Sequence, residues 1–207
     1  MKKLYLTKTL LDSWIYYVKS ADSNEEQAKE SFFNVLNKIK TEPNPDMLRG
    51  LEFEKVIYDY LEGKEPLENT PDRVEIAEIL KDALIQEPLM CKYGDYDKME
   101  VYLYGITDAI KFNTIYDIKR VRSYNPPKYL KSTQHLLYLC ASDCEQFTYL
   151  ISDGEDCYKE TYCKSNRTSW ELSNVILDFF NWLKTTGNFE AYIKNYDAEE
   201  KIKEMQL

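Results

Sequence analysis

The chain has 207 residues, of which 43% are hydrophobic and 30% charged, and its formal net charge is −9. This composition is that of a globular domain with a packed core. The chain contains no run of 18 apolar residues, so the sequence predicts no membrane-spanning helix and no membrane partner. Its N-terminus lacks the apolar stretch and cleavage site of a signal peptide, so we expect a cytoplasmic protein.

The cysteines and the histidine limit the metal sites and catalytic mechanisms that the chain can support. No CxxC pair is present, which argues against zinc, and without a secretion signal we expect reduced thiols at Cys91, Cys140, Cys144, Cys157 and Cys163. The lone histidine, His135, excludes any mechanism or metal site that needs several histidines and is interpreted as an ordinary helix residue.

The first half of the chain has helical periodicity. Residues 6–20 form a short amphipathic pattern, and a capping box at 23–26 opens a second helix. The prolines of TEPNPDM break that helix. We expect a third helix from near Asp46 to about Glu62, ending at Gly63, and a fourth from Thr70-Pro71 to about Gln86.

The second half begins with alternating patterns typical of strands, at 89–93, 99–112 and 115–121. Pro126-Pro127 opens a helix expected to continue through residue 141. Two further strands, 146–152 and 157–163, are joined at Asp153-Gly154, and Thr168 and Glu171 cap a late helix. This order predicts a single α/β domain over residues 1–207, in which helices flank a mixed central β-sheet.

The segment ITDAIKFNTIYDIK contains the strongest candidate for a functional site. With Asn113-Thr114 as a two-residue turn, Asp108 faces Lys119 and Ile110 faces Asp117. The two aspartates then lie diagonally on one face, about 7–8 Å apart at the backbone, where they repel each other unless they share a cation. Oxygen ligands at this density favour Mg²⁺ or Mn²⁺. The alternative is a surface salt bridge between Asp108 and Lys119.

Three neighbouring features favour the metal site. Glu54 falls on the apolar stripe of the third helix, with Met47, Leu51 and Ile57, where an ionised carboxylate is costly unless it is paired or metal-bound. An ammonium at Lys119 can orient a metal-bound water or offset charge on a phosphate. Gly105, in a strand, marks a bulge or a close backbone approach.

A local reversal of charge follows the hairpin. Between Lys111 and Lys131 six basic residues stand beside one acid, which suits a phosphate-binding surface, although a solvated loop remains the alternative. Lys131, Gln134 and Tyr138 are spaced to share a helix face and to hold a phosphate or a base. The alternative for these three is a half-buried helix face.

Together these residues resemble the PD-(D/E)xK nuclease superfamily, in its RecB-like and phage exonuclease-type branch. The motifs occur in the expected order over residues 47–140: G-x-x-x-E ending at Glu54, G-x-x-D ending at Asp108, D-x-K from Asp117 to Lys119, and Q-x-x-x-Y from Gln134 to Tyr138. The resemblance implies a restriction-endonuclease-like core at about 47–165 with helical N- and C-terminal extensions.

The resemblance also implies roles. Glu54, Asp108, Asp117 and the Ile118 carbonyl would bind Mg²⁺ or Mn²⁺, and Lys119 would assist the attacking water. Gln134 and Tyr138 would support the site or contact DNA. We expect Arg120, Arg122, Lys128 and Lys131 to hold the DNA strand beside it.

The function expected from this resemblance is DNA phosphodiester hydrolysis, acting on ends or single strands in phage or bacterial recombination and repair. A homo-oligomer or a phage recombination partner is also implied. Glu54 stands where many RecB-like relatives carry histidine. The spacing of the cysteines does not match that of an iron–sulfur cluster, so no cluster is expected. The alternatives are a catalytically idle nuclease-fold protein that binds nucleic acid or a protein, and an interaction domain without metal.

Overall fold

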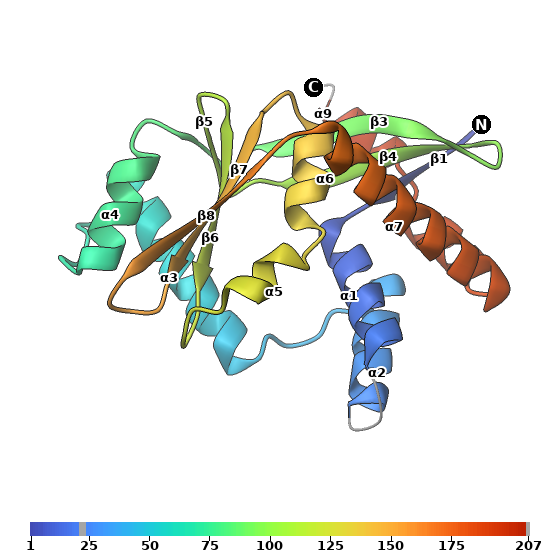
Figure 1. Cartoon of the computed structure of the whole chain (residues 1–207), viewed down its shortest axis with the longest axis horizontal. Coiled ribbons are helices and arrows are strands. Elements are labelled where there is room, and N and C mark those ends of the chain that lie inside the picture. Colours follow the sequence, from blue (N-terminus) through green and yellow to red (C-terminus); the bar gives the residue numbers. More distant parts are fainter. Residues whose placement is uncertain (21–23, 206–207) are drawn as a thin grey trace.

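The computed structural model describes residues 1–20 and 24–205, and it has the mixed α/β architecture expected from the sequence (Figure 1). Among these residues, no helix is long and apolar enough to cross a bilayer. In chain order the elements are β1 (Lys2–Leu6), α1 (Lys8–Lys19), α2 (Glu25–Leu36), α3 (Pro45–Leu61), α4 (Pro71–Leu80), β2 (Leu84–Ile85), β3 (Pro88–Tyr96), β4 (Met99–Ile106), β5 (Ala109–Lys111), β6 (Thr114–Arg120), α5 (Pro126–Leu130), α6 (Gln134–Ala141), β7 (Gln146–Ser152), β8 (Cys157–Cys163), α7 (Asn166–Thr185), α8 (Phe189–Asn195) and α9 (Glu199–Met205).

The strands form two sheets rather than the one central sheet that was predicted. The first has the order β1-β4-β3 and the second the order β2-β5-β6-β7-β8. Both are mixed, because β1 pairs with β4 in parallel and β6 pairs with β7 in parallel, while the other pairings are antiparallel. The chain leaves the first sheet at Ile106 and enters the second at Ala109, so Asp108 lies at the junction between them.

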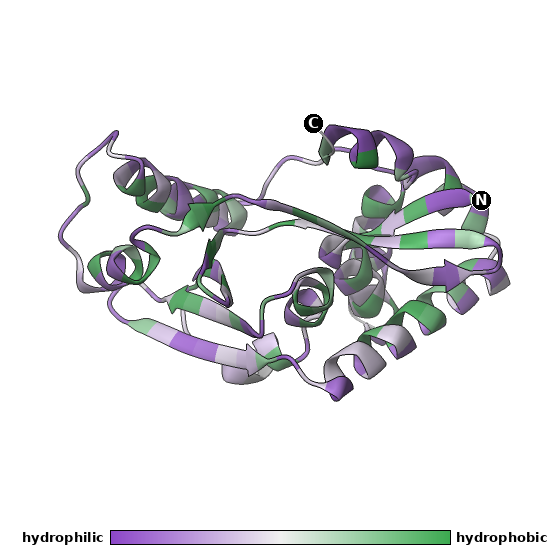
Figure 2. Ribbon diagram, turned by 90° about the horizontal axis from the view of Figure 1, so that it is seen from above, coloured by the Kyte–Doolittle hydropathy of each residue, from purple (hydrophilic) through white to green (hydrophobic). Residues whose placement is uncertain are grey.

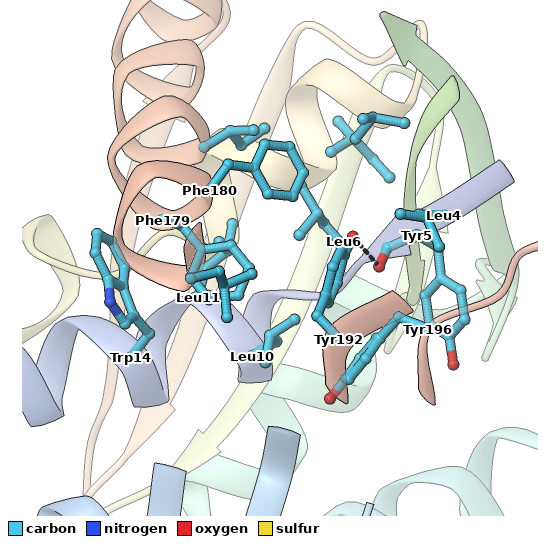
Figure 3. Close-up of a cluster of buried hydrophobic side chains, with 14 of the residues drawn as sticks. Leu4, Tyr5, Leu6, Leu10, Leu11, Trp14, Phe179, Phe180, Tyr192 and Tyr196 are labelled. Atoms are coloured by element: carbon cyan, nitrogen blue, oxygen red, sulfur yellow. Dashed lines mark hydrogen bonds between the residues drawn. The ribbon is translucent and has the colours of Figure 1, made fainter. Parts of the chain in front are cut away.

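The first sheet is covered by the N- and C-terminal helices. Its core combines β1 and α1 with α7 and α8, and Figure 3 shows Leu6, Leu10 and Leu11 packed towards Phe179 and Phe180. The Tyr192 hydroxyl, fully buried, donates a hydrogen bond of 3.0 Å to the carbonyl of Tyr5. These contacts hold α1 in place beside β1, which the sequence patterns did not identify as a strand.

The second sheet has helices on both faces. Ile118 and Leu150 pack with Phe53 and Ile57 of α3 on one face, in a cluster that also includes residues of α4. Ile115 and Tyr149 pack with Tyr138 of α6 on the other face. Figure 2 shows hydrophobic residues, in green, along the strands and the helices of the molecule. This alternation along β6 directs Ile115 and Asp117 towards α6.

Several predicted boundaries were wrong for identifiable reasons. α4 ends at Leu80 instead of Gln86, because Asp82 adopts a positive φ of 64° and the chain turns into β2. The predicted helix 126–141 is two helices, α5 and α6, separated at residues 131–133. α7 begins three residues earlier than expected, with Ser165 as N-cap and Thr168 as the partner in its capping box. The box predicted at 23–26 begins at Ser23, outside the described residues.

Candidate active site

The β5–β6 hairpin carries the two aspartates, but its turn differs from the predicted one. Lys111 pairs with Thr114, so the loop residues are Phe112 and Asn113, and Phe112 takes the positive φ of 53°. The pairing is shifted by two residues from the predicted register. Because side chains alternate with a period of two, an even shift keeps each strand residue on its predicted face. Ala109 pairs with Tyr116, which places the preceding residue, Asp108, alongside Asp117 rather than diagonal to it.

Asp108 is held by the backbone of the neighbouring strand. It lies in the bend before β5, and its Oδ2 accepts a hydrogen bond of 2.7 Å from the Ile118 N–H. Burial and then the charge of Asp117 raise the pKa of Asp108 to about 7, although Lys119 acts in the opposite direction. A carboxylate in this setting gains from a nearby cation.

Asp117 is buried and held from two sides. The Gln134 side-chain amide donates a hydrogen bond to its Oδ1, and Lys119 Nζ lies 2.5 Å from its Oδ2. Oδ2 is buried, and the ammonium of Lys119 is its charged partner. Burial lowers the pKa of Lys119, but the charges of Asp117 and Asp108 outweigh it and raise that pKa overall. The lysine is therefore a cation at this position.

Glu54 approaches the aspartates from α3. Burial raises the pKa of its carboxyl group, Lys119 lowers it, and Asp117 raises it further, so the three carboxylates and the lysine share one electrostatic environment. The predicted apolar stripe around Glu54 was partly wrong. Met47 and Leu51 are 57% and 55% exposed, because the buried face of α3 is centred on Phe53 and Ile57.

The donor atoms of the site suit a divalent metal ion in chemical type but are not gathered around one point. Among the described residues, no three aspartate, glutamate, histidine or cysteine side chains are gathered closely enough to hold an ion as they stand. The donors that are present suit Mg²⁺ or Mn²⁺, because they are carboxylate oxygens and one of them, the buried Asp117 Oδ2, has only the ammonium of Lys119 as a partner. The structure thus provides a pair of carboxylates, and Glu54 is close enough for the charge of Asp117 to raise its pKa.

Gln134 and Tyr138 support this arrangement from α6. Both are buried, and the Tyr138 hydroxyl donates a 2.7 Å hydrogen bond to the carbonyl of Ile106. A Cβ built on Gly105 would lie 2.7 Å from the Tyr138 ring, which confirms the close backbone approach expected at this glycine. Of the two predicted roles for the Q-x-x-x-Y residues, these contacts favour support of the site over contact with DNA.

The predicted DNA-binding cations divide into two groups. Arg120, Lys128 and Lys131 line a groove of about 650 Å³ that reaches Lys119 and Gln134. Arg122 does not line it and instead donates hydrogen bonds of 3.1 and 3.2 Å to Asp46. Lys131 does not share a helix face with Gln134 and Tyr138, because α5 ends at Leu130 and α6 starts at Gln134.

Residues of α1 that the sequence patterns did not identify also lie at the site. Lys8 lines the groove, and burial together with the nearby charge of Lys119 lowers its pKa. Asp12 accepts hydrogen bonds of 2.7 Å from the backbone and the hydroxyl of Thr133, and one of 3.0 Å from Ser132. The sequence feature that could have identified this face of α1 is the recurrence of Lys8, Asp12, Tyr16 and Lys19 at helical spacing.

Comparison with known proteins identifies the fold. No protein-family model matches the chain, and no curated protein matches its sequence. Solved structures do match it. LHK-Exo, solved in complex with dAMP, has a TM-score of 0.53 and 12% sequence identity over 87% of this chain and 88% of its own. SSO0001 has a TM-score of 0.51 and 13% identity over 86% of this chain and 77% of its own. At these identities the likeness shows a shared fold.

Proposed function

We propose that this protein is a Mg²⁺- or Mn²⁺-dependent nuclease that hydrolyses DNA phosphodiester bonds, acting as an exonuclease at DNA ends. The observation that carries the proposal is the Asp117 carboxylate, fixed by Gln134 and Lys119 beside Asp108 at the end of a basic groove. The fold shared with LHK-Exo, whose name marks it as an exonuclease and which was solved with a nucleotide, supports it.

In this proposal Asp108, Asp117 and the Ile118 carbonyl would hold the ion, and Glu54 would complete the set. The bound ion would supply a Lewis acid that makes water more acidic and neutralises charge on the phosphate. The residues of the chain position the reactants. The Ile118 N–H fixes Asp108 and Gln134 fixes Asp117. Lys119 provides a positive charge that orients the attacking water or offsets the growing negative charge of the phosphate.

The test is a cleavage assay on labelled linear and circular DNA, single- and double-stranded, with Mg²⁺, Mn²⁺ or EDTA. We expect metal-dependent loss of linear DNA from its ends, which Asp117→Asn abolishes while the circular-dichroism spectrum stays unchanged. Asp178→Asn, an exposed acid on α7, is the matched control and should cleave as the wild type does. Full activity of Asp117→Asn in a clean preparation would refute the assignment.

One observation favours a second candidate, a catalytically idle protein that binds nucleic acid or a protein partner. The three carboxylates are not gathered into a group that could hold an ion as they stand. If this candidate is correct, DNA binds equally well in Mn²⁺ and in EDTA and is never cut. A cytoplasmic location, a role in phage or bacterial recombination and repair, and a homo-oligomer or phage recombination partner stay predictions.

A further inference from the structure

One face of α1 has an unusual composition for a helix that packs in a core. Lys8, Asp12, Ile15, Tyr16 and Lys19 all line the groove, while the opposite face of the helix is buried in the first core. Their spacing of 4, 3, 1 and 3 residues places them on one stripe. From Lys8 to Lys19 the helix rises by roughly 16 Å. The stripe therefore presents a cation at each end, with Ile15 and Tyr16 between them.

The opposite wall of the groove comes from α5 and the residues that follow it. Lys128 and Lys131 stand on this side, together with the buried Tyr129, whose hydroxyl has no hydrogen-bond partner. The groove continues to Lys119 and Gln134, which contact Asp117. It therefore leads directly from the solvent to the candidate active site.

Four lysines of this groove have no acidic partner within ion-pair distance in the part of the chain that the structure describes. Among the described residues, Lys8, Lys19, Lys128 and Lys131 form no ion pair, whereas many cations elsewhere in the chain do, such as Lys92 with Glu100 and Lys184 with Asp97. Asp12 lines the groove, but hydrogen bonds from Ser132 and Thr133 occupy both of its oxygens. In a chain of net charge −9, a groove with unpaired lysines on both walls favours a polyanionic ligand.

We propose that this groove holds a segment of single-stranded DNA that runs along α1 into the active site. The proposal rests on the proposed function and names its substrate more closely. Lysines on both walls suit the phosphates of a strand, and Tyr16, which is 50% exposed between them, offers a ring on which an unpaired base can stack. The groove volume of about 650 Å³ has room for a few nucleotides of a single strand.

The experiment measures binding in EDTA, where cleavage does not interfere. Fluorescence anisotropy of a labelled oligothymidine, and of a blunt duplex of equal length, is recorded over a range of salt concentrations. The variants are Lys19→Gln, Lys131→Gln and Tyr16→Ala. Lys2→Gln is the matched control, because Lys2 is an exposed lysine at the far end of β1, about 20 Å along the chain from Lys8.

The two kinds of variant should have different signatures. Each lysine variant should reduce the slope of log affinity against log salt concentration by about 0.7, the value for one lost contact with a single-strand phosphate. Tyr16→Ala should weaken oligothymidine binding about 5- to 150-fold and leave the slope unchanged, because stacking releases no counterion. Duplex binding should be weaker and insensitive to Tyr16→Ala, and Lys2→Gln should match the wild type.

The proposal is overturned if the duplex binds more tightly than the single strand, or if Tyr16→Ala and both lysine variants bind oligothymidine as the wild type does. Its failure is distinguishable from failure of the proposed function. Metal-dependent cleavage with unaltered binding by these variants would remove the groove proposal and leave the nuclease. The predicted binding signatures without cleavage in Mn²⁺ would support the groove proposal and refute the nuclease.

Discussion

His135 should make the stability of this protein depend on pH in mildly acidic solution. It lies in α6 next to Gln134, with its ring stacked on Tyr162 at a centroid distance of 4.0 Å. Burial lowers its pKa from 6.5 to about 4, against the smaller opposing effects of Glu171, Asp12 and Glu160. Its Nδ1 is buried without a hydrogen-bond partner. The folded protein therefore holds this ring neutral in a range where the unfolded chain protonates it.

The size of the effect follows from the two pKa values. Above pH 6.5 both states are neutral at this residue, and its contribution to stability is fully present. Between pH 6.5 and 4 the unfolded state binds more protons, so the free energy of unfolding falls as the pH falls. The loss is about 2 kcal/mol at pH 5, about 3 kcal/mol at pH 4 and approaches about 3.4 kcal/mol below that, at 1.36 kcal/mol for each pKa unit.

His135→Phe isolates this contribution, because it keeps an aromatic ring against Tyr162 and removes the titrating group. Urea unfolding followed by circular dichroism, from pH 4.5 to 7.5 at constant ionic strength, gives the free energy of unfolding of both proteins. The variant should gain on the wild type as the pH falls, by about 2 kcal/mol between pH 7.5 and 5. Parallel curves for the two proteins would refute the reasoning, since other groups titrate equally in both.

Two further predictions concern the candidate site. Gly105→Ala places a methyl group against the Tyr138 ring, so it should lower the free energy of urea unfolding by about 1–3 kcal/mol. The same substitution should cost less in a Tyr138→Leu background, where the ring is absent. Equal losses in both backgrounds would contradict the contact. Mn²⁺ at about 100 times its dissociation constant should add about 2.7 kcal/mol and raise the midpoint of thermal unfolding by about 5–10 °C. Asp117→Asn should abolish that shift, and an equal shift in this variant would place the ion elsewhere.

The candidate site was largely predictable because it depends on local alternation. Asp117 and Lys119 share a face in any strand that contains both, and the error of two residues in the hairpin register left that face unchanged. Asp108 was predicted on the same face but diagonal to Asp117. It lies alongside Asp117 because it is in a bend at the junction of the two sheets, where the chain does not alternate regularly. Glu54 was placed near the aspartates from its helix, although the side of α3 that is buried was misjudged.

The remaining errors arise from contacts between segments distant in the sequence. β1 is five residues long and begins with two lysines, so only its pairing with β4 defines it as a strand. The break between α5 and α6 is fixed by the hydrogen bonds from Ser132 and Thr133 to Asp12, about 120 residues earlier in the chain, and no local propensity reports such a contact. The groove was missed for the same reason, since its two walls come from opposite halves of the chain.

The attachment of Asp12 to Thr133 makes the N-terminal helix a structural part of the acid pair. Thr133 hydrogen-bonds to Asp12 and is followed at once by Gln134, whose side-chain amide donates a hydrogen bond to Asp117. The contact with residue 12 therefore fixes the backbone directly before the group that orients the buried carboxylate. A shortened chain without α1 would keep the residues of the hairpin and every acid of the site, yet the segment that leads into Gln134 would lose its hydrogen bonds to Asp12. The part of the chain that holds the candidate site in place therefore extends well upstream of the segment that carries the motifs.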